Sequence, residues 1–201
     1  EILKKKTIKD LIAPSGIDAS NIDHLEIISS VTRYARSFFV STLPRMCTFP
    51  ELFRDMYLFG DINTSIYINP IPESRSQNEL NRVINELETE RIVAADRGNI
   101  NRESDLSQKR FEAEQLRDEI AAGYNKLYEA SIVSTLFSYS LEDLDRFTKL
   151  LATEMSKSLV GVKSAWAMQE EAFKSNLPLM DDKIKKTHTF DRRSMGTVFP
   201  F

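Results

Sequence analysis

Short stretches rich in Ile, Val, Phe and Tyr recur along the chain, and several of them alternate between apolar and polar residues. This two-residue period, combined with β-branched and aromatic side chains, predicts β-strands. The predicted strands span residues 25–30, 33–43, 62–68, 127–139 and 162–168. The first two are expected to form a hairpin that ends at Pro44, and Pro70 closes the third strand.

Apolar residues spaced three and four positions apart predict two amphipathic helices between these strands. The first is expected over residues 49–59, with Thr48 as its N-cap. The second is expected to begin after the capping residue Ser140, to use Leu159 on its apolar face and to end at Gly161.

Residues 73–122 differ in character, because 12 acidic and 8 basic residues leave only a narrow apolar stripe. Apolar residues repeat at intervals of seven in two runs, and a turn-forming sequence at residues 96–101 separates the runs. We therefore expect helices over 75–96 and 103–122 that form an antiparallel hairpin, each arm roughly 30 Å long. The expected seam consists of Leu80, Ile84, Leu87, Ala94, Leu106, Ala113, Leu116 and Ile120.

The order of the predicted elements is β-β-α-β-(αα)-β-α-β, without strict alternation of strand and helix. This order predicts an α+β fold with a mainly antiparallel sheet and a ferredoxin-like split βαβ core, into which the long antiparallel helical hairpin is inserted. Residues 1–176 are assigned to this domain, with 75–122 as the inserted hairpin. Residues 177–201 are interpreted as a connector, with a helical turn expected at 180–186.

Composition narrows the class of protein. A hydrophobic content of 41% is ordinary for a globular domain, and a net charge of −3 gives no overall attraction to nucleic acid. The single cysteine, Cys47, cannot form an internal disulfide, which favours a reducing compartment. No apolar run approaches the roughly 20 residues of a membrane-spanning helix. We therefore expect a cytoplasmic domain.

The chain lacks the sequence signatures of common catalytic and metal sites. A phosphate-binding P-loop ends in Gly-Lys, and none of the six glycines is followed by Lys. His24, His188 and Cys47 are too isolated in the sequence to form a metal-binding motif. Nucleophilic catalysis is disfavoured, because the chain has two histidines and no G-x-S-x-G motif. We expect no catalytic, metal-binding or cofactor-binding residue in this chain.

Five segments resemble, in order, parts of a known family. They are Asp10–Ile17, Tyr34–Arg45, Asp61–Pro70, Leu177–Leu179 and Thr197–Phe201. Together they resemble the VirB-type conjugation ATPases of type IV secretion systems, the CagE/TrbE/VirB group. The segments are similar to the N-terminal start, the first hairpin, a later strand and the segment that leads to the motor domain in that family. The resemblance spans nearly the whole chain. The resemblance implies that the chain is the N-terminal domain of such an ATPase and ends before the C-terminal motor domain. The first residue, which is not Met, also indicates a piece of a longer protein.

The resemblance implies a non-catalytic docking domain that positions a hexameric motor at the membrane channel during conjugative DNA transfer. The implied partners are channel subunits, including a small inner-membrane protein, together with the chain's own motor domain and further copies of the full-length protein. ATP and Mg²⁺ are expected in the missing motor domain. The implied location is cytoplasmic, peripheral to the inner face of the cell membrane.

The inserted hairpin is interpreted either as a packing element or as an arm that docks onto a partner protein. Candidate interaction residues are basic side chains on the hairpin and near the C-terminus. They are Arg82, Arg91, Arg97, Arg102, Arg110, Lys183, Lys185, Lys186, Arg192 and Arg193. The alternative functions are a stand-alone scaffold or adaptor and a single-stranded DNA-binding domain of the transfer machinery. Direct DNA binding is disfavoured, because the aromatic strand 36–40 lacks the glycine of an RNA-recognition strand and the net charge is negative.

Overall fold

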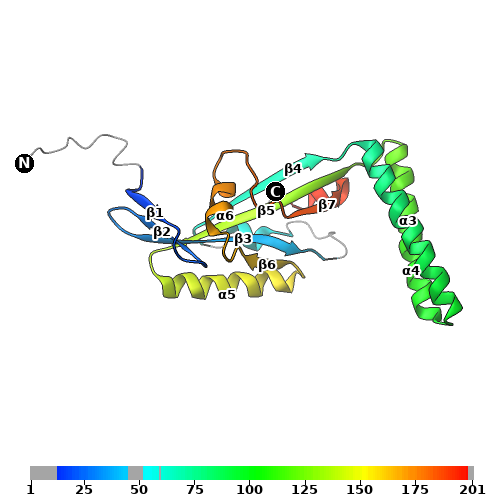
Figure 1. Ribbon diagram of the computed structural model, residues 1–201, viewed down its shortest axis with the longest axis horizontal. Helices are drawn as coiled ribbons and strands as arrows, with labels where there is room; N and C mark the ends of the chain where they lie inside the picture. The colour runs from blue at the N-terminus through cyan, green and yellow to red at the C-terminus, as the bar shows by residue number, and fades with distance from the viewer. Residues whose placement is uncertain (1–12, 45–51, 59, 199–201) are drawn as a thin grey trace, which may run out of the picture. The chain divides into compact units, whose positions relative to one another are not determined.

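The computed structural model describes residues 13–44, 52–58 and 60–198 (Figure 1). The strands are β1 (Gly16–Asp18), β2 (Leu25–Ile28), β3 (Arg33–Thr42), β4 (Ile62–Pro70), β5 (Leu127–Ser138), β6 (Gly161–Ser164) and β7 (Thr187–Asp191). The helices are α2 (Arg54–Leu58), α3 (Glu73–Asp96), α4 (Ile100–Ala121), α5 (Leu141–Lys157), α6 (Gln169–Asn176) and α7 (Arg192–Gly196). The predicted α+β class with a mainly antiparallel sheet is confirmed. The expected N-cap Thr48 and Cys47 lie outside the described residues.

The chain forms two compact units. The first contains the described residues within 1–68, 130–188 and 196–201, and the second contains 69–129 and 189–195. The first unit therefore holds most of the sheet with α2, α5 and α6, and the second holds the helical hairpin α3–α4 and α7.

The first unit is built on the predicted split βαβ core. Four strands lie in the order β6-β3-β5-β4, with α2 connecting β3 to β4 and α5 connecting β5 to β6. This is the ferredoxin-like connectivity. Strand β3 pairs antiparallel with both β5 and β6, and the N-terminal strands β1 and β2 extend the sheet from β3.

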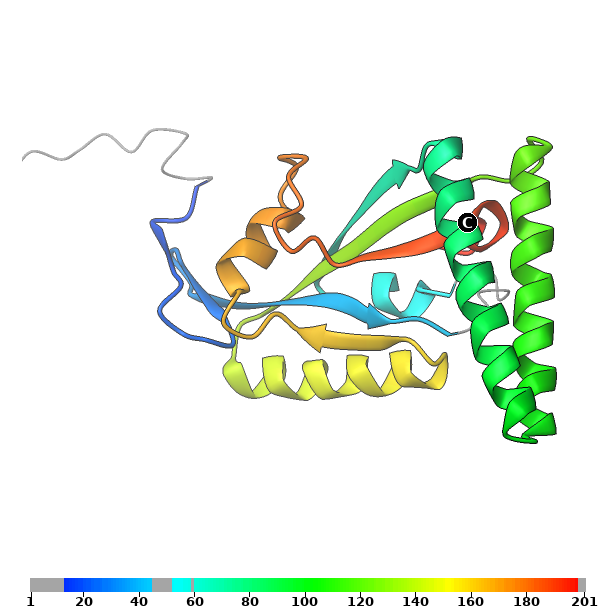
Figure 2. The same ribbon diagram turned by 45° about the vertical axis from the view of Figure 1, so that its right-hand side comes forward.

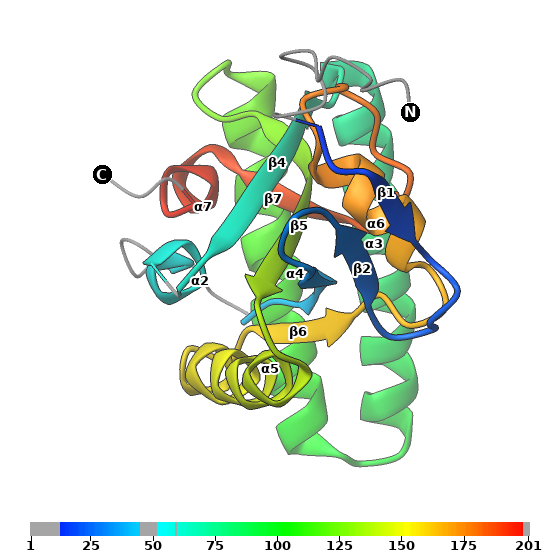
Figure 3. The same cartoon turned by 90° about the vertical axis from the view of Figure 1, so that its left-hand side faces the viewer.

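Helices α5 and α6 lie on opposite sides of β3 (Figure 2). The apolar face of α5 is buried through Leu144, Leu151 and Met155, and Figure 3 shows this helix end-on beside β6. Ser140 caps α5 as predicted, because its hydroxyl accepts a hydrogen bond from the Asp143 N–H at 3.1 Å. On the other side, Ala172 of α6 packs in a cluster with Val133 and Ala165.

A buried glutamine completes the hydrogen bonding of β3. One edge of β3 is shared by two short strands, since β2 pairs as far as Ala35 and the pairing with β6 starts at Phe38, opposite Ser164. Between them, the Gln169 side chain accepts from the Ser37 N–H at 2.7 Å and donates to the Ser37 carbonyl at 3.3 Å and the Ser164 hydroxyl at 3.1 Å. Its amide thus replaces the strand segment that is missing there.

The last predicted strand, 162–168, is correct only as far as Ser164. A tight turn follows, in which Ala167 has a left-handed φ of 61° and donates its N–H to the Ile22 carbonyl at 2.8 Å. Helix α6 starts immediately after this turn, where the sequence pattern predicted no helix. Helix α5 also ends earlier than predicted, at Lys157, and leaves Leu159 exposed.

The interpretation of residues 177–201 as a connector alone is wrong for their described part. Residues 187–191 form β7, which pairs with β5, and residues 192–196 form α7. The helical turn expected at 180–186 is absent from the described secondary structure. A short strand such as β7 is determined by the partner to which it hydrogen bonds, and local sequence gives little sign of it.

The second unit contains the predicted antiparallel hairpin of α3 and α4, which lie side by side (Figure 1). Gly98, with a φ of +67°, ends α3, and the Asn99 N–H then bonds to the Ala94 carbonyl at 3.0 Å in a Schellman arrangement. Asn99 also caps α4, because its side chain accepts from the Arg102 N–H. One residue pair thus closes one helix and opens the next.

The hairpin seam follows the predicted heptads, but it is thickest at the base, where α3 begins and α4 ends. Leu80 and Ile120 pack there with Ile71 and Leu127 in a buried cluster, and Leu116 packs against it. Farther along, the buried seam residues are Ile84, Ala94 and Leu106. The thin middle of the seam is therefore held by other contacts.

A candidate protein interface on the helical hairpin

Five charged side chains bridge the two helices in the middle of the hairpin. Arg91 contacts Glu88 at 2.9 Å and Glu103 of the facing helix at 3.2 Å. Arg110 contacts Glu88 across the seam at 2.6 Å and Glu114 on its own helix at 2.9 Å. Hydrogen bonds from the guanidinium groups of Arg91 and Arg110 lower the pKa of Glu88 to about 2. We call this group the charge clamp.

The charge clamp assigns two of the predicted interaction residues to a role within the hairpin. The guanidinium groups of Arg91 and Arg110 each contact two carboxylates, so their charge is already matched. A partner protein would have to displace those carboxylates before it could bind either group. Both residues therefore stabilise the arm.

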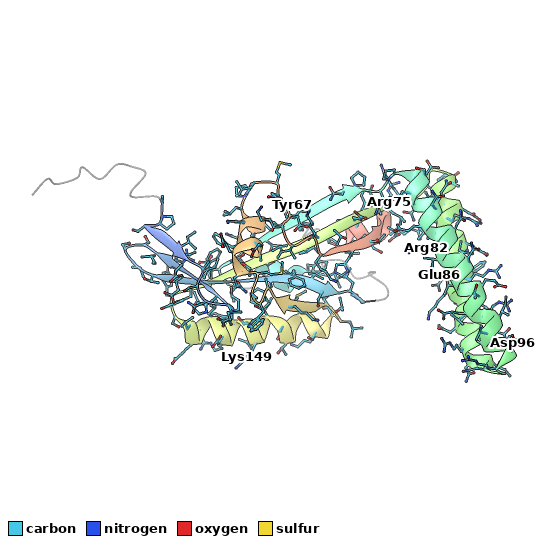
Figure 4. The ribbon with its side chains drawn as sticks, in the orientation of Figure 1. Tyr67, Arg75, Arg82, Glu86, Asp96 and Lys149 are labelled. Atoms are coloured by element: carbon cyan, nitrogen blue, oxygen red, sulfur yellow. The ribbon has the colours of Figure 1, made fainter. Side chains whose placement is uncertain are left out.

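Two other predicted arginines on the hairpin form weaker pairs. Arg82 lies 3.6 Å from Glu86 on α3 (Figure 4), and both side chains are more than half exposed. Arg102 lies 3.4 Å from Glu90 across the seam, and both side chains are more than half exposed. Exposed pairs of this kind contribute about 0 to 1 kcal/mol, so the charges can be exchanged with a partner at little cost.

The tip of the hairpin presents exposed apolar side chains and an unpaired cation. Ile92 is 49% exposed, Val93 43% and Ile100 76%. A shallow hollow of about 280 Å³ lies there, with Val93, Arg97 and Arg102 in its wall. The Arg97 side chain forms no ion pair with any described residue. We call Ile92, Val93, Arg97, Ile100 and Arg102 the tip surface.

The basic cluster predicted near the C-terminus is divided between the two units. Lys183, Lys185 and Lys186 are exposed in the first unit, and Lys183 pairs with Asp181 at 2.7 Å. Arg192 and Arg193 are exposed on α7 in the second unit. These five residues are therefore not treated as one site.

The aromatic strand considered for nucleic-acid binding is covered on both faces. Phe38 is 3% exposed, and Phe39 packs against the Val133–Ala165–Ala172 cluster beneath α6. Phe38 therefore offers no face on which a base could stack, and the half-buried Phe39 is engaged in packing. The structure therefore gives β3 a packing role.

The described residues also bear on metal sites and membrane-spanning helices. Within them, no three His, Cys, Asp or Glu side chains gather as a metal site, and no helix is long and apolar enough to cross a membrane. No protein-family model and no curated protein matches the chain. The expectations of no cofactor and of kinship with VirB-type ATPases stay predictions.

The apolar part of the tip surface was missed from the sequence. Ile92 and Val93 lie between the seam positions Leu87 and Ala94, and Ile100 lies in the turn sequence. The sequence did contain a signal for this surface, because these apolar residues lie outside the heptad positions of an otherwise charged hairpin.

Proposed function

We propose that this chain is a non-catalytic docking domain of a type IV secretion ATPase, and that the hairpin binds a protein of the secretion channel through the tip surface. The observation that carries the proposal is the exposure of Ile92, Val93 and Ile100 near the tip of the hairpin, where Val93 lines the same hollow as the unpaired Arg97. Apolar side chains clustered with a guanidinium are typical of protein interfaces, where burial of the apolar surface drives association.

The construction of the hairpin supports a docking role. The buried base, the charge clamp and the hydrogen-bonded turn at Gly98 hold together the two helices that carry the tip. An interface that is ordered in advance loses less conformational entropy on binding. A helix pair serving only to cover the sheet would not need an apolar surface at its tip.

The setting of this function comes from the resemblance to VirB-type ATPases. In this proposal the full-length protein carries an ATP-hydrolysing motor and assembles with further copies of itself. The domain lies in the cytoplasm at the inner face of the membrane, and the tip surface binds a channel subunit or its small inner-membrane companion. Channel assembly, and through it DNA transfer, depends on this contact.

Site-specific photo-crosslinking in the full-length protein tests the proposal. A photoreactive amino acid replaces either Arg97 at the tip or Gln115, an exposed residue on α4 outside the tip surface, in cells that assemble the secretion channel. We expect a crosslink to a channel subunit from position 97 and none from position 115. Equal crosslinks from both positions, or none from position 97, would contradict the proposal.

A matched pair of variants tests the consequence for transfer. The double change Ile92→Asp and Val93→Asp places two carboxylates on the tip surface, and Phe111→Asp makes the same kind of change at an exposed position elsewhere on α4. We expect the tip variant to lower DNA transfer at least tenfold while the ATPase rate of the full-length protein stays unchanged. Transfer that is equal in the two variants would exclude the tip surface as the docking site.

A further inference from the structure

A second hollow lies at the base of the hairpin, within the second unit. It measures about 460 Å³, a size common among ligand sites. Tyr124, Lys126, Tyr128 and Arg192 contribute to its wall. They come from the segment after α4, from β5 and from α7, so the fold brings together residues that are far apart in the sequence. We call this feature the base hollow.

The base hollow carries an excess of positive charge. Lys126 and Arg192 are exposed, and neither side chain forms an ion pair with a residue that the structure describes. Among the described lining residues, Glu73 is the only carboxylate, and it accepts a hydrogen bond from the Gln77 amide at 2.9 Å. Two cations against one anion leave a charge of +1 in a protein whose net charge is −3. The hollow is therefore suited to an anion.

A buried side chain joins the two backbone segments that carry the cations. The Asn125 side-chain oxygen accepts the backbone N–H of Lys126 at 2.8 Å and that of Arg192 at 3.1 Å. The Asn125 amide nitrogen donates to Glu119 at 2.8 Å, and the residue is 9% exposed. One amide thus holds two cationic residues from distant parts of the chain at the same wall. Two cationic side chains that start from the same wall can contact one phosphate group together.

The aromatic residues narrow the class of anion. Tyr124 is 77% exposed although it is a large ring, and Tyr128 is half-buried in the same wall. An exposed aromatic ring beside Lys and Arg is the combination that binds a nucleotide, because the ring stacks on the base while the cations contact the phosphate. Inorganic phosphate would use only the cations and would leave the rings in water.

We propose that the base hollow binds a nucleoside monophosphate group, with Lys126 and Arg192 at the phosphate and Tyr124 against the base. This group occurs both in free nucleotides and at the 5′ end of a nucleic-acid single strand. This site is separate from the tip surface, and the proposal of nucleotide binding does not depend on the docking function.

Isothermal titration of the 201-residue chain with four probes tests the proposal. The probes are AMP, inorganic phosphate, adenosine and a 5′-phosphorylated dinucleotide. We expect AMP or the dinucleotide to bind at least tenfold more tightly than phosphate or adenosine. Tighter binding of AMP indicates a free nucleotide, and tighter binding of the dinucleotide indicates the end of a strand. Phosphate that binds as tightly as either nucleotide, or the absence of binding by both nucleotides, would overturn the proposal.

Three variants assign the binding to the base hollow. Lys126→Gln, Arg192→Gln and Tyr124→Ala are each expected to weaken nucleotide binding at least tenfold. Arg193→Gln is the matched control, because it removes the same charge from the neighbouring residue of α7, which does not line the hollow. Circular dichroism verifies that each variant is folded. Loss of binding in the control equal to that in Arg192→Gln would show that general positive charge, and not this site, attracts the ligand.

Discussion

The bridge that Gln169 makes between two incomplete strand pairings leads to a specific stability prediction. Replacing Gln169 with Leu keeps the approximate volume of the side chain and removes all three of its hydrogen bonds. The residue is 3% exposed and Ser37 is fully buried, so water cannot take the place of the amide without opening the site. The loss should therefore appear as reduced stability of the first unit.

The magnitude follows from what each partner retains. The Ser37 carbonyl keeps a second donor, the Ala165 N–H at 2.9 Å. The Ser37 N–H loses the Gln169 oxygen at 2.7 Å, and no other acceptor is found for it among the described residues. An unsatisfied buried donor costs about 1 to 3 kcal/mol, and loss of the bond to the Ser164 hydroxyl adds a smaller amount. We expect Gln169→Leu to lower the free energy of unfolding by about 2 to 3 kcal/mol.

Urea unfolding measures this change by circular dichroism and by the fluorescence of Trp166, the only tryptophan, which lies three residues before the mutated position. Gln108→Leu is the matched control, because Gln108 is exposed on α4 and its side chain donates a hydrogen bond to Glu112, a residue of the same helix. The control should change the free energy of unfolding by no more than about 0.5 kcal/mol. Equal shifts of the unfolding curve in the two variants would show that the Gln169 hydrogen bonds do not stabilise the first unit.

Two further predictions concern the second unit. Because the pKa of Glu88 is lowered, its ion pairs with Arg91 and Arg110 contribute fully to stability above pH 4.5, its ordinary pKa, and this contribution is lost as the pH falls towards 2. Acid titration followed by circular dichroism should therefore show a steeper loss of helix in the natural chain than in Glu88→Gln over this range. Parallel curves for the two proteins would contradict this role of Glu88. Ile120→Ala, which opens a cavity in the buried base, should lower the free energy of unfolding by about 2 to 4 kcal/mol. Phe111→Ala, at an exposed position on the same helix, should change it by less than 1 kcal/mol or so in the same urea assay, and equal losses would refute the account of the base.

Elements with local signals could be predicted from the sequence. The heptad spacing and the turn around Gly98 place α3 and α4 within three residues of their observed ends. The pairing of Ser140 with Asp143 likewise marks the start of α5, because the capping hydrogen bond spans only three residues. In each case the stabilising contact and the sequence pattern lie in the same short segment.

Elements whose cause is distant in the chain were missed. The segment after Ser164 has the composition of a strand. It does not continue as a strand, because the Gln169 side chain hydrogen bonds to Ser37, which lies 132 positions earlier. That contact requires the turn at Ala167 and the helix that follows it. The base hollow was missed for the same reason, since the Asn125 amide joins Lys126 to Arg192 only after β7 and α7 have formed.

The basic residues of the hairpin unit differ in whether a carboxylate can reach them. Arg110 has Glu114 one turn away and Glu88 on the facing helix, so its charge is matched within the arm. Asp191 is adjacent to Arg192, but its carboxylate accepts the backbone N–H groups of Arg193 and Ser194 at 3.3 and 3.0 Å.

This difference separates the arginines that stabilise the hairpin from those that are available to bind a partner or a ligand. In the middle of the hairpin, regular helix geometry places Asp and Glu three or four residues from each arginine. At the two ends, the chain leaves the helices, and the side chains of Asn99, Asn125 and Asp191 hydrogen bond to backbone N–H groups instead. Arg97 and Arg192 lie at these ends without a carboxylate partner among the described residues. Neutralising either one should therefore weaken ligand binding and leave the arm folded, whereas neutralising Arg110 should loosen the arm itself.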